Sequence, residues 1–411
     1  MALLCFLMPL FSSKSSSAHD EGDHNDGGES MLQHFVSLEG GRQDASATAY
    51  KKLKQLFAPF VLRRSKADVL SQILPPKDRR VEFVELEKTG RSTYDSVISN
   101  HLKAKKKGNA LSREHLFTQL RKAAHHPLLL RTRYTSTAEK EHLTHWFYRY
   151  GAFRGEGCTK GKVAEELERY TDFRIHLTTL DLIEENELRR PELERYVLDQ
   201  SDLFSSAKFV KLRQLLPGLV ADGHRILIFS VWTTCLDLLS CLLEQMNLGY
   251  LRMDGSTTVS DRQGLIDKFN NDASIPVFLL STKACGMGIN LTAADTCIVH
   301  DLDFNPFNDL QAEDRCHRIG QKKPVTVIKL VSKDTVDEDI YEMQQRKAKM
   351  NAAIMESGPS ESGWTKEAPK NKDVVLQTAV ERFLKSPKAK HPPSIPDENQ
   401  DENSADVRVD V

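Results

Sequence analysis

Apolar and polar residues follow a repeated strand-then-helix order from Ser205 onward. Short runs rich in Val, Ile, Leu and Phe predict strands; they lie at 225–232, 250–255, 275–282, 295–303 and 324–332. The segments between them, such as 234–248 and 260–270, space their apolar residues at helical intervals. Apolar strands that alternate with helices are typical of a parallel sheet covered on both faces. The pattern therefore predicts an α/β domain with helices on both faces of a parallel sheet.

Three helices of this part can be placed in the sequence, two by the pattern at their first residues and one by the strand before it. Ser260 with Gln263, and Thr335 with Glu338, match the capping-box pattern at a helix start. A third helix is predicted over "QAEDRCHRIG", which follows the strand at 295–303.

The first two hundred residues are mostly helical in pattern. Helical spacing is present at 50–73, at 118–130 and in the charged segment 134–201, and one alternating strand is predicted at 80–86. Ser12–Glu29 is predicted to be a loop. The tail from Ser357 is rich in Pro, Ser and charged residues, which predicts disorder apart from a short docking helix at 374–386.

The apolar start of the chain, at 1–11, is too short to span a bilayer. Since no basic residue precedes it, we favour a core helix of a domain whose front is missing over a signal peptide. Nothing later reaches transmembrane length, so no membrane partner is expected.

Charge and cysteine content exclude several classes of protein. The chain has 57 Lys and Arg against 58 Asp and Glu, so only local patches could attract nucleic acid. The seven cysteines are scattered and form no C-x-x-C pair, which favours a reducing compartment over a disulfide framework or a zinc ribbon. His142 and His145 lack a third ligand nearby, and we expect them to be exposed helix positions. No metal site is predicted.

Gln311, Arg315 and Arg318 are candidates for binding a polyphosphate. On the predicted helix they lie at i, i+4 and i+7 and would share one face. Two guanidinium groups and an amide suit phosphate oxygens, which accept paired hydrogen bonds. The alternative is an arginine pair bonded to nearby acids. A loop of small residues after a predicted strand, "STKACGMGIN" at 281–290, strengthens the ligand-binding interpretation.

Several motifs resemble the second lobe of the SWI/SNF family of DNA-dependent ATPases. They are "RILIFSVWT", "YLRMDGSTT", "STKACGMGINLTAAD" and "DLDFNPFNDLQAEDRCHRIGQ". "PFVLRRSKADVLSQILPPK" and "QLRKAAHHPLLL" resemble helical insertions and the linker of that family, and "MALLCFLMP" the helix after its third motif. The spacing is most similar to the subgroup with SMARCAD-type remodelers. The resemblance implies a RecA-like second lobe preceded by a mostly helical region.

The resemblance also implies roles for matching residues. Arg315 and Arg318 would be catalytic arginine fingers on the γ-phosphate of ATP, with Gln311 helping to position them. The coupling loop between nucleotide and DNA would contain Gly286, Gly288 and Asn290. The residues that would lie along the DNA backbone are Ser230, Trp232, Ser281, Thr282, Lys283, Asn305 and Asn308. Cys285 stands where the family usually has Gly, so coupling by this loop is in doubt.

ATP hydrolysis needs a phosphate loop and an acidic box for magnesium, and no clear match to either is present. "GEGCTKGKV" has five residues between Gly155 and Gly161, and Val163 replaces the magnesium-binding hydroxyl, so we interpret it as a charged turn. "HDEGDH" at 19–24 follows no apolar strand directly and is interpreted as an acidic loop. ATP with Mg²⁺ would therefore be held mostly by a first lobe that this sequence largely lacks.

The resulting organisation has four parts. We expect a remnant of the first ATPase lobe with helical insertion at 1–88, and further insertion and linker at 89–200. The helicase carboxyl-terminal lobe would occupy 201–355, and the mostly disordered tail 356–411. The family implies an ATP-dependent DNA translocase that remodels chromatin in the nucleus, with double-stranded DNA, nucleosomes and histones as partners. The alternative is a catalytically inactive fragment that binds DNA or chromatin.

Overall fold

The computed structural model consists of two units, each described by itself. It describes residues 66–70, 72–108, 112–153, 157–185, 191–283, 289–356 and 372–385. The first unit comprises Met1–Leu70 and Arg346–Ala368; the second comprises Ser71–Gln345 and Pro369–Val411. Within the first, the structure describes α4 (Lys66–Leu70) and the last turns of α16 (Val336–Glu356). The predictions for 1–11 and for "HDEGDH" fall outside the described residues.

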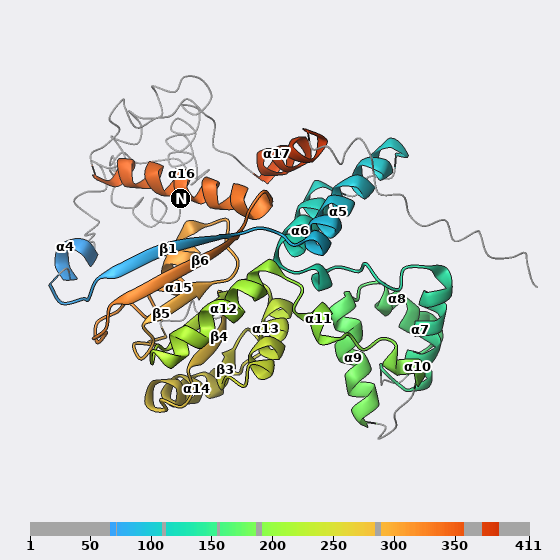
Figure 1. Ribbon diagram of the computed structural model, residues 1–411, viewed down its shortest axis with the longest axis horizontal. Helices are drawn as coiled ribbons and strands as arrows, with labels where there is room; N and C mark the ends of the chain where they lie inside the picture. The colour runs from blue at the N-terminus through green and yellow to red at the C-terminus, as the bar shows by residue number, and fades with distance from the viewer. Residues whose placement is uncertain are drawn as a thin grey trace, which may run out of the picture. The chain divides into compact units, whose positions relative to one another are not determined.

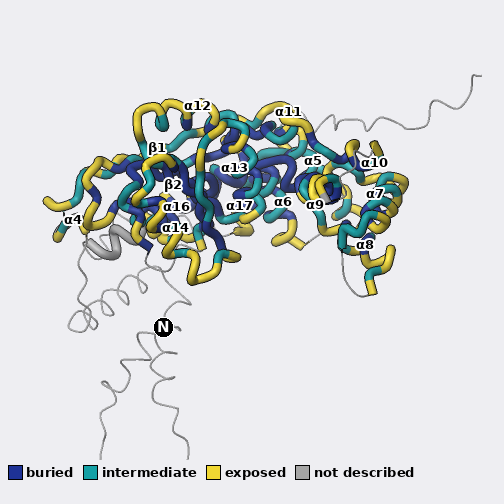
Figure 2. Tube along the Cα trace, turned by 90° about the horizontal axis from the view of Figure 1, so that it is seen from below, coloured by how far each residue is buried: buried dark blue, intermediate teal, exposed yellow. Residues whose placement is uncertain are grey.

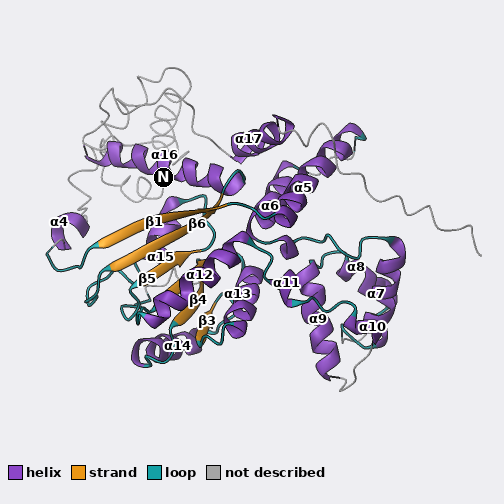
Figure 3. Cartoon of the chain, viewed as in Figure 1, coloured by secondary structure: helices purple, strands orange, loops and turns teal. Residues whose placement is uncertain are grey.

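The second unit is built on a six-stranded sheet with the order β1-β6-β5-β2-β4-β3 (Figures 1 and 3). All neighbouring strands are parallel. The strands are β1 (Lys77–Val84), β2 (Ile226–Ser230), β3 (Tyr250–Met253), β4 (Val277–Ser281), β5 (Thr296–Val299) and β6 (Val325–Ser332). The predicted parallel sheet is confirmed.

Strand β1 is the edge strand of this sheet. It pairs with β6 in register from Lys77 opposite Val325 to Val84 opposite Ser332. The alternating pattern at 80–86 correctly predicted a strand, but not its partner, which is remote in the sequence. The four domain boundaries stay predictions, and the sheet contains one strand from outside 201–355.

Alternating side chains of the sheet belong to two different cores. In β2, Leu227 and Phe229 lie in one buried cluster, whereas Ile226 and Ile228 lie in the other. The first cluster includes residues of α14 (Val259–Asn271) and α16, and the second includes residues of α12 (Ala207–Ala221) and α13 (Thr233–Gln245). Helices therefore cover both faces, and the central strands are buried (Figure 2).

One predicted helix start was wrong, and the other was partly right. The N-cap of α14 is Thr258, whose hydroxyl accepts from the Asp261 N–H; the helix begins before Ser260, which lies in its first turn. At α16 the Thr335 hydroxyl accepts from the Asp337 N–H at 3.1 Å, as a cap does. The Glu338 carboxylate, however, accepts from the Asp334 N–H, one residue earlier than a capping box requires.

The helices between residues 88 and 203 confirm the prediction that the region before the second lobe is mostly helical. They are α5 (Lys88–Lys106), α6 (Arg113–His125), the 3-10 turn η2 (Pro127–Leu129), α7 (Thr137–Arg149), α8 (Lys160–Leu167), α9 (Asp172–Glu185), α10 (Pro191–Glu194) and α11 (Gln200–Leu203). Residues of α7 to α10 form their own buried cluster, which includes Phe147 and Tyr196.

The docking helix predicted at 374–386 is α17 (Lys372–Lys385). It lies beside α5 and α6 (Figures 1 and 2) and buries Val375, Leu376 and Ala379 in the same cluster as Tyr94 and Leu120. Arg382 donates to the buried Asp339 of α16 at 2.9 Å. The rest of the predicted disordered tail lies outside the described residues.

Candidate functional site

Most of the residues predicted to follow DNA gather at the carboxyl edge of the sheet. Ser230 ends β2 and lies opposite Ser281, which ends β4. The two strand ends are joined by a hydrogen bond from the Thr282 N–H to the Ser230 carbonyl at 3.0 Å. Trp232 and Lys283 follow within two residues of these ends. The parallel arrangement explains the gathering, because carboxyl ends of parallel strands meet at one edge.

These residues differ in how far solvent reaches them. Ser230 and Ser281 are buried, Thr282 and Trp232 are half-buried, and Lys283 is exposed. A phosphate could therefore reach Lys283, Thr282 and the Trp232 ring directly. The Ser230 hydroxyl could contact a phosphate only if it left its present partner.

That partner is Asp301, which follows β5. Its carboxylate accepts from the Ser230 hydroxyl and, at 2.7 Å, from the Val231 N–H. Burial opposes ionisation of Asp301, but the His300 ring and the Ser230 hydroxyl hold the pKa of this carboxyl below its ordinary value. Asp301 thus fixes the loop that leads from β2 to Trp232. This role of Asp301 could not be predicted from the sequence.

Lys208 of α12 is a buried cation that contacts His300, the residue next to Asp301. Its ammonium group is fully buried and lies 2.7 Å from the Asp337 carboxylate. It also donates to the carbonyls of His300 at 2.6 Å and Leu330 at 2.9 Å, and lies 3.2 Å from Nδ1 of His125. Burial, together with this cation, lowers the pKa of His125 to about 3, so that its ring stays neutral. One cation thereby links α12, β6, α16, α6 and the end of β5.

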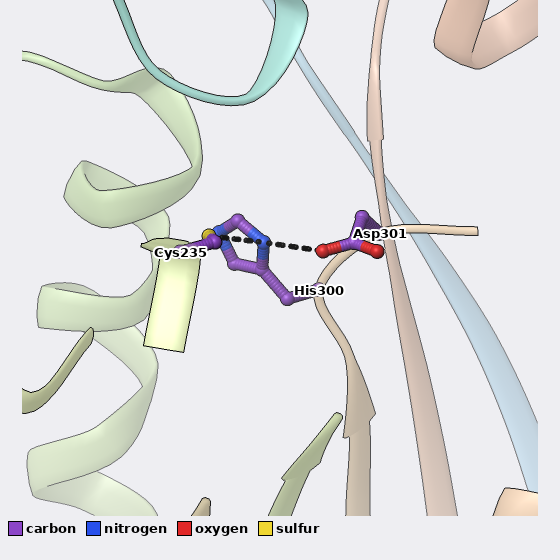
Figure 4. A group of neighbouring side chains, drawn as sticks. All are labelled: Cys235, His300 and Asp301. Atoms are coloured by element: carbon purple, nitrogen blue, oxygen red, sulfur yellow. Dashed lines mark hydrogen bonds and ion pairs between the residues drawn. The ribbon is translucent and has the colours of Figure 1, made fainter. Parts of the chain in front are cut away.

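Cys235, His300 and Asp301 form a buried group whose donor atoms lie within 4.8 Å of one another (Figure 4). The Cys235 sulfur lies 3.5 Å from His300 Nδ1. Both Asp301 oxygens already accept hydrogen bonds, and burial raises the pKa of the Cys235 thiol. In the structure the three side chains form a hydrogen-bonded core cluster.

Asn305 and Asn308 lie at the start of α15 (Pro306–Glu313), also at the carboxyl edge. Asn305 is the N-cap residue, and its side-chain oxygen accepts from the Phe307 N–H at 3.2 Å. The backbone N–H of Asn308 donates to the Asn305 carbonyl at 3.0 Å. Asn305 is exposed and Asn308 is half-buried, so both amide groups are within reach of a ligand along this edge.

The prediction that Gln311, Arg315 and Arg318 share one helix face was wrong. Helix α15 ends at Glu313, and the arginines lie in the turns that follow it. The chain leaves the helix because the Arg315 carbonyl accepts from the Leu291 N–H at 3.1 Å, which ties this segment to the loop before β5. The turn also buries Cys316, whose thiol lies 3.1 Å from the Glu313 carbonyl.

The arginines consequently lie at the opposite end of α15 from Asn305. The eight-residue helix separates the two ends by about 12 Å. Gln311 and Arg318 are exposed, whereas Arg315 is half-buried and its Nε has no hydrogen-bond partner among the described residues. A buried guanidinium N–H without an acceptor is suited to an incoming anion.

The segment with the arginines is held by ion pairs to one buried carboxylate, Glu313, that the sequence did not reveal. Glu313 is fully buried and lies 2.9 Å from Arg79 Nε, 3.4 Å from Lys77 Nζ and 3.5 Å from Lys329 Nζ. Strands β1 and β6 therefore fix the end of α15, and with it the start of the arginine segment. The chemistry of the site thus depends on β1, which lies far from it in the sequence.

The loop of small residues is only partly described. Gly286, Gly288 and Cys285 fall outside the described residues. Asn290 is exposed, and its carbonyl accepts from the Asn270 side chain at 3.0 Å. Since Leu291 bonds Arg315, the structure brings Asn290 and the arginine segment together.

Two other sequence features have structural roles. In "GEGCTKGKV", Thr159 is the N-cap of α8, and Lys162 donates to the Gly157 carbonyl at 3.0 Å, as expected for a charged turn. His145 is exposed as predicted, but His142 is half-buried, with Nδ1 2.6 Å from the Tyr196 hydroxyl and Nε2 accepting from the Trp146 indole at 3.0 Å.

A parallel six-stranded sheet covered by helices on both faces is the α/β architecture of a RecA-like lobe. The family model described as "Helicase conserved C-terminal domain" matches residues 207–320, and the one described as "SNF2-related domain" matches residues 2–129. The chain belongs to the SNF2-related, or SWI/SNF, family. None of the described helices has the length and apolarity needed to cross a membrane.

Named relatives and one solved structure agree with this assignment. The chain is 44% identical to "Protein CHROMATIN REMODELING 19" of Arabidopsis thaliana over 75% of its own length and 41% of that protein. It is 38% identical to the human "SWI/SNF-related matrix-associated actin-dependent regulator of chromatin subfamily A containing DEAD/H box 1", over 85% of this chain and 32% of the relative. It thus spans less than half of either relative.

A similar solved structure is "Crystal structure of the C-terminal part of Fun30 ATPase domain". It is 31% identical, with a TM-score of 0.61, and the match covers 75% of this chain and 99% of the other. This similarity supports the RecA-like α/β fold and the family assignment independently of the motifs.

Proposed function

We propose that the chain is the second-lobe portion of an ATP-dependent DNA translocase that remodels chromatin in the nucleus. The observation that carries this proposal is the arrangement along α15. Two of the predicted DNA-contacting residues, Asn305 and Asn308, lie at its start, and the arginine segment lies beyond its end. A rigid helix between the two sets would transmit movement between DNA and nucleotide.

DNA would be bound along the carboxyl edge. Lys283, Thr282, Asn305 and Asn308 would contact the sugar-phosphate backbone, since hydroxyl, amide and ammonium donors suit phosphate oxygens at any sequence. The half-buried Trp232 ring would lie beside them. The buried Ser230 and Ser281 would position the loops. Double-stranded DNA in nucleosomes, and the histones around it, are the proposed partners.

The nucleotide would be held mostly by the first ATPase lobe, for which the proposed boundaries leave a remnant at 1–88. ATP with Mg²⁺ supplies the transferable phosphoryl group. Arg315 and Arg318 would approach the γ-phosphate and stabilise charge as it develops, with Gln311 helping to position them. Asn290, with Gly286 and Gly288, would form the coupling loop. The proposed second lobe occupies 201–355, between the helical linker at 89–200 and the tail at 356–411.

A second candidate is a nucleotide-free fragment that binds DNA or chromatin. The lack of a clear phosphate-loop match in the 411 residues favours it for the chain as it stands. The arginine segment favours the translocase for the protein that carries both lobes. Both candidates require binding to the DNA backbone.

Replacing Lys283 by Ala is expected to weaken duplex DNA binding and to reduce its log–log salt slope by about one unit, as for a single lost phosphate contact. The side chain is exposed at the proposed track, so its removal should leave the fold unchanged. Fluorescence anisotropy on two unrelated duplexes across a salt series would measure the slope.

The matched control is Lys140→Ala on α7, where the lysine is paired with Glu168 at 2.9 Å and lies away from the track. Its slope should equal that of the unmodified chain. An unchanged slope in Lys283→Ala, or a strong preference for one duplex, would count against phosphate tracking by this edge.

A further inference from the structure

The carboxyl edge carries an aromatic and cationic cluster that includes residues from outside the 201–355 segment. Its members are Trp232, Phe304, Arg121 and Lys122 of α6, and Lys372 of α17. The Arg121 guanidinium lies 5.5 Å from the centre of the Trp232 ring and 5.4 Å from that of Phe304. Lys122 lies 5.8 Å from the Trp232 ring, and Lys372 lies 5.3 Å from the Phe304 ring.

Arg121 organises this cluster. It is 8% exposed and donates to the Leu302 carbonyl at 2.7 Å, while its Nε has no hydrogen-bond partner among the described residues. It thereby fixes α6 against the loop that runs from β5 to Asn305. The Trp232 indole N–H is also buried without an acceptor in the described part of the chain. The Arg121 and Lys122 cations both lie over its ring.

The three cations have no carboxylate partner within 4 Å among the residues that the structure describes. Many other lysines are paired: Lys140 with Glu168, Lys211 with Glu82, and Lys333 with Glu85. Burial lowers the pKa of Lys122, and a nearby anion would favour its charged form. Lys122 and Lys372 therefore give this edge unneutralised positive charge beside aromatic rings, which is complementary to a polyanion.

We infer that Lys122 of α6 and Lys372 of α17 extend the DNA track, each contacting a backbone phosphate beside Trp232 and Asn305. This inference rests on the proposed function, because it names further residues of the same DNA-binding edge. The helical segment and the carboxyl-terminal helix would then take part in DNA binding directly, in addition to packing on the second lobe.

The test is the salt dependence of duplex DNA binding by the full 411-residue chain. Lys122→Ala combined with Lys372→Ala should reduce the log–log slope by about two units, one for each lost phosphate contact. Both side chains lie at the surface or half-buried, and neither makes an ion pair whose loss would disturb the fold. Circular dichroism should be unchanged.

The control is Lys140→Ala combined with Lys211→Ala, which removes the same charge from paired positions away from this edge and should leave the slope unchanged. If the double variant keeps the full slope while Lys283→Ala still reduces it, the inference is wrong and the proposed function stands. If the unmodified chain shows no salt-dependent binding, both are wrong. Loss of poly-glutamate binding in the double variant, with DNA binding intact, would overturn the inference in favour of an acidic polypeptide.

Discussion

Replacing Arg315 or Arg318 by Ala is expected to lower the kcat of DNA-stimulated ATP hydrolysis by ~10³-fold or more, within the 10³–10⁵ that arginine fingers contribute. The KM for ATP should change much less. The reason is that a guanidinium that meets charge developing in the transition state stabilises that state more than bound substrate. The Arg315 Nε is buried without an acceptor among the described residues, so it is available to donate to a bound phosphate.

Steady-state turnover at saturating DNA, in a protein that carries this chain together with a phosphate loop, would measure the effect. Arg169→Ala is the control, because this exposed arginine of the α7–α10 helical region pairs, among the described residues, with Glu165 and Glu166 of its own segment. It should leave kcat unchanged. An unchanged kcat in Arg315→Ala or Arg318→Ala would contradict the assignment of that residue.

Replacing Lys208 by Met is expected to lower the free energy of unfolding by about 3–5 kcal/mol, the usual cost of removing one partner of a buried ion pair. The variant leaves the Asp337 carboxylate, 1% exposed, without its cation, and two backbone carbonyls without their donor. Asp337→Asn should act in the same direction, since it leaves the ammonium buried without its counter-charge. Denaturant unfolding followed by circular dichroism would measure both.

Lys211 on the same helix supplies the control. It pairs with Glu82 at 2.9 Å, but both side chains are about 30% exposed. Lys211→Ala should therefore cost no more than about 1 kcal/mol. Equal costs for Lys208→Met and Lys211→Ala would show that the buried network contributes little.

The strands and most helices could be predicted because their signals are local. β2 and β4 are buried at every position and apolar up to a final serine, and α13 repeats its apolar residues at helical spacing. The partner of β1 could not be predicted, because its pairing with β6 joins residues some 250 positions apart. The end of α15 could not be predicted for the same reason. The hydrogen bond from the Leu291 N–H to the Arg315 carbonyl joins two separate segments of the chain.

The sequence indicated which types of residue form the candidate site, but not which neighbours surround each of them. The sequence singled out Ser230 as a candidate DNA-backbone residue, but could not show that its hydroxyl donates to Asp301. Lys208 carries no such signal, because a lysine near the start of a helix usually faces solvent. Its partners come from four distant segments, so only the folded chain reveals it as a buried cation.

The central proposal has two parts. This chain supplies two arginine side chains to an ATP molecule that is held mostly by another lobe, and it binds the DNA backbone along the carboxyl edge of its sheet. ATP turnover by the purified 411-residue chain, with and without duplex DNA, tests the proposal most directly. The expected rate is that of a buffer blank in both cases, while anisotropy shows that the same preparation binds DNA. DNA-stimulated hydrolysis that disappears in Arg318→Ala would contradict the claim, because the chain would then hold and hydrolyse the nucleotide by itself.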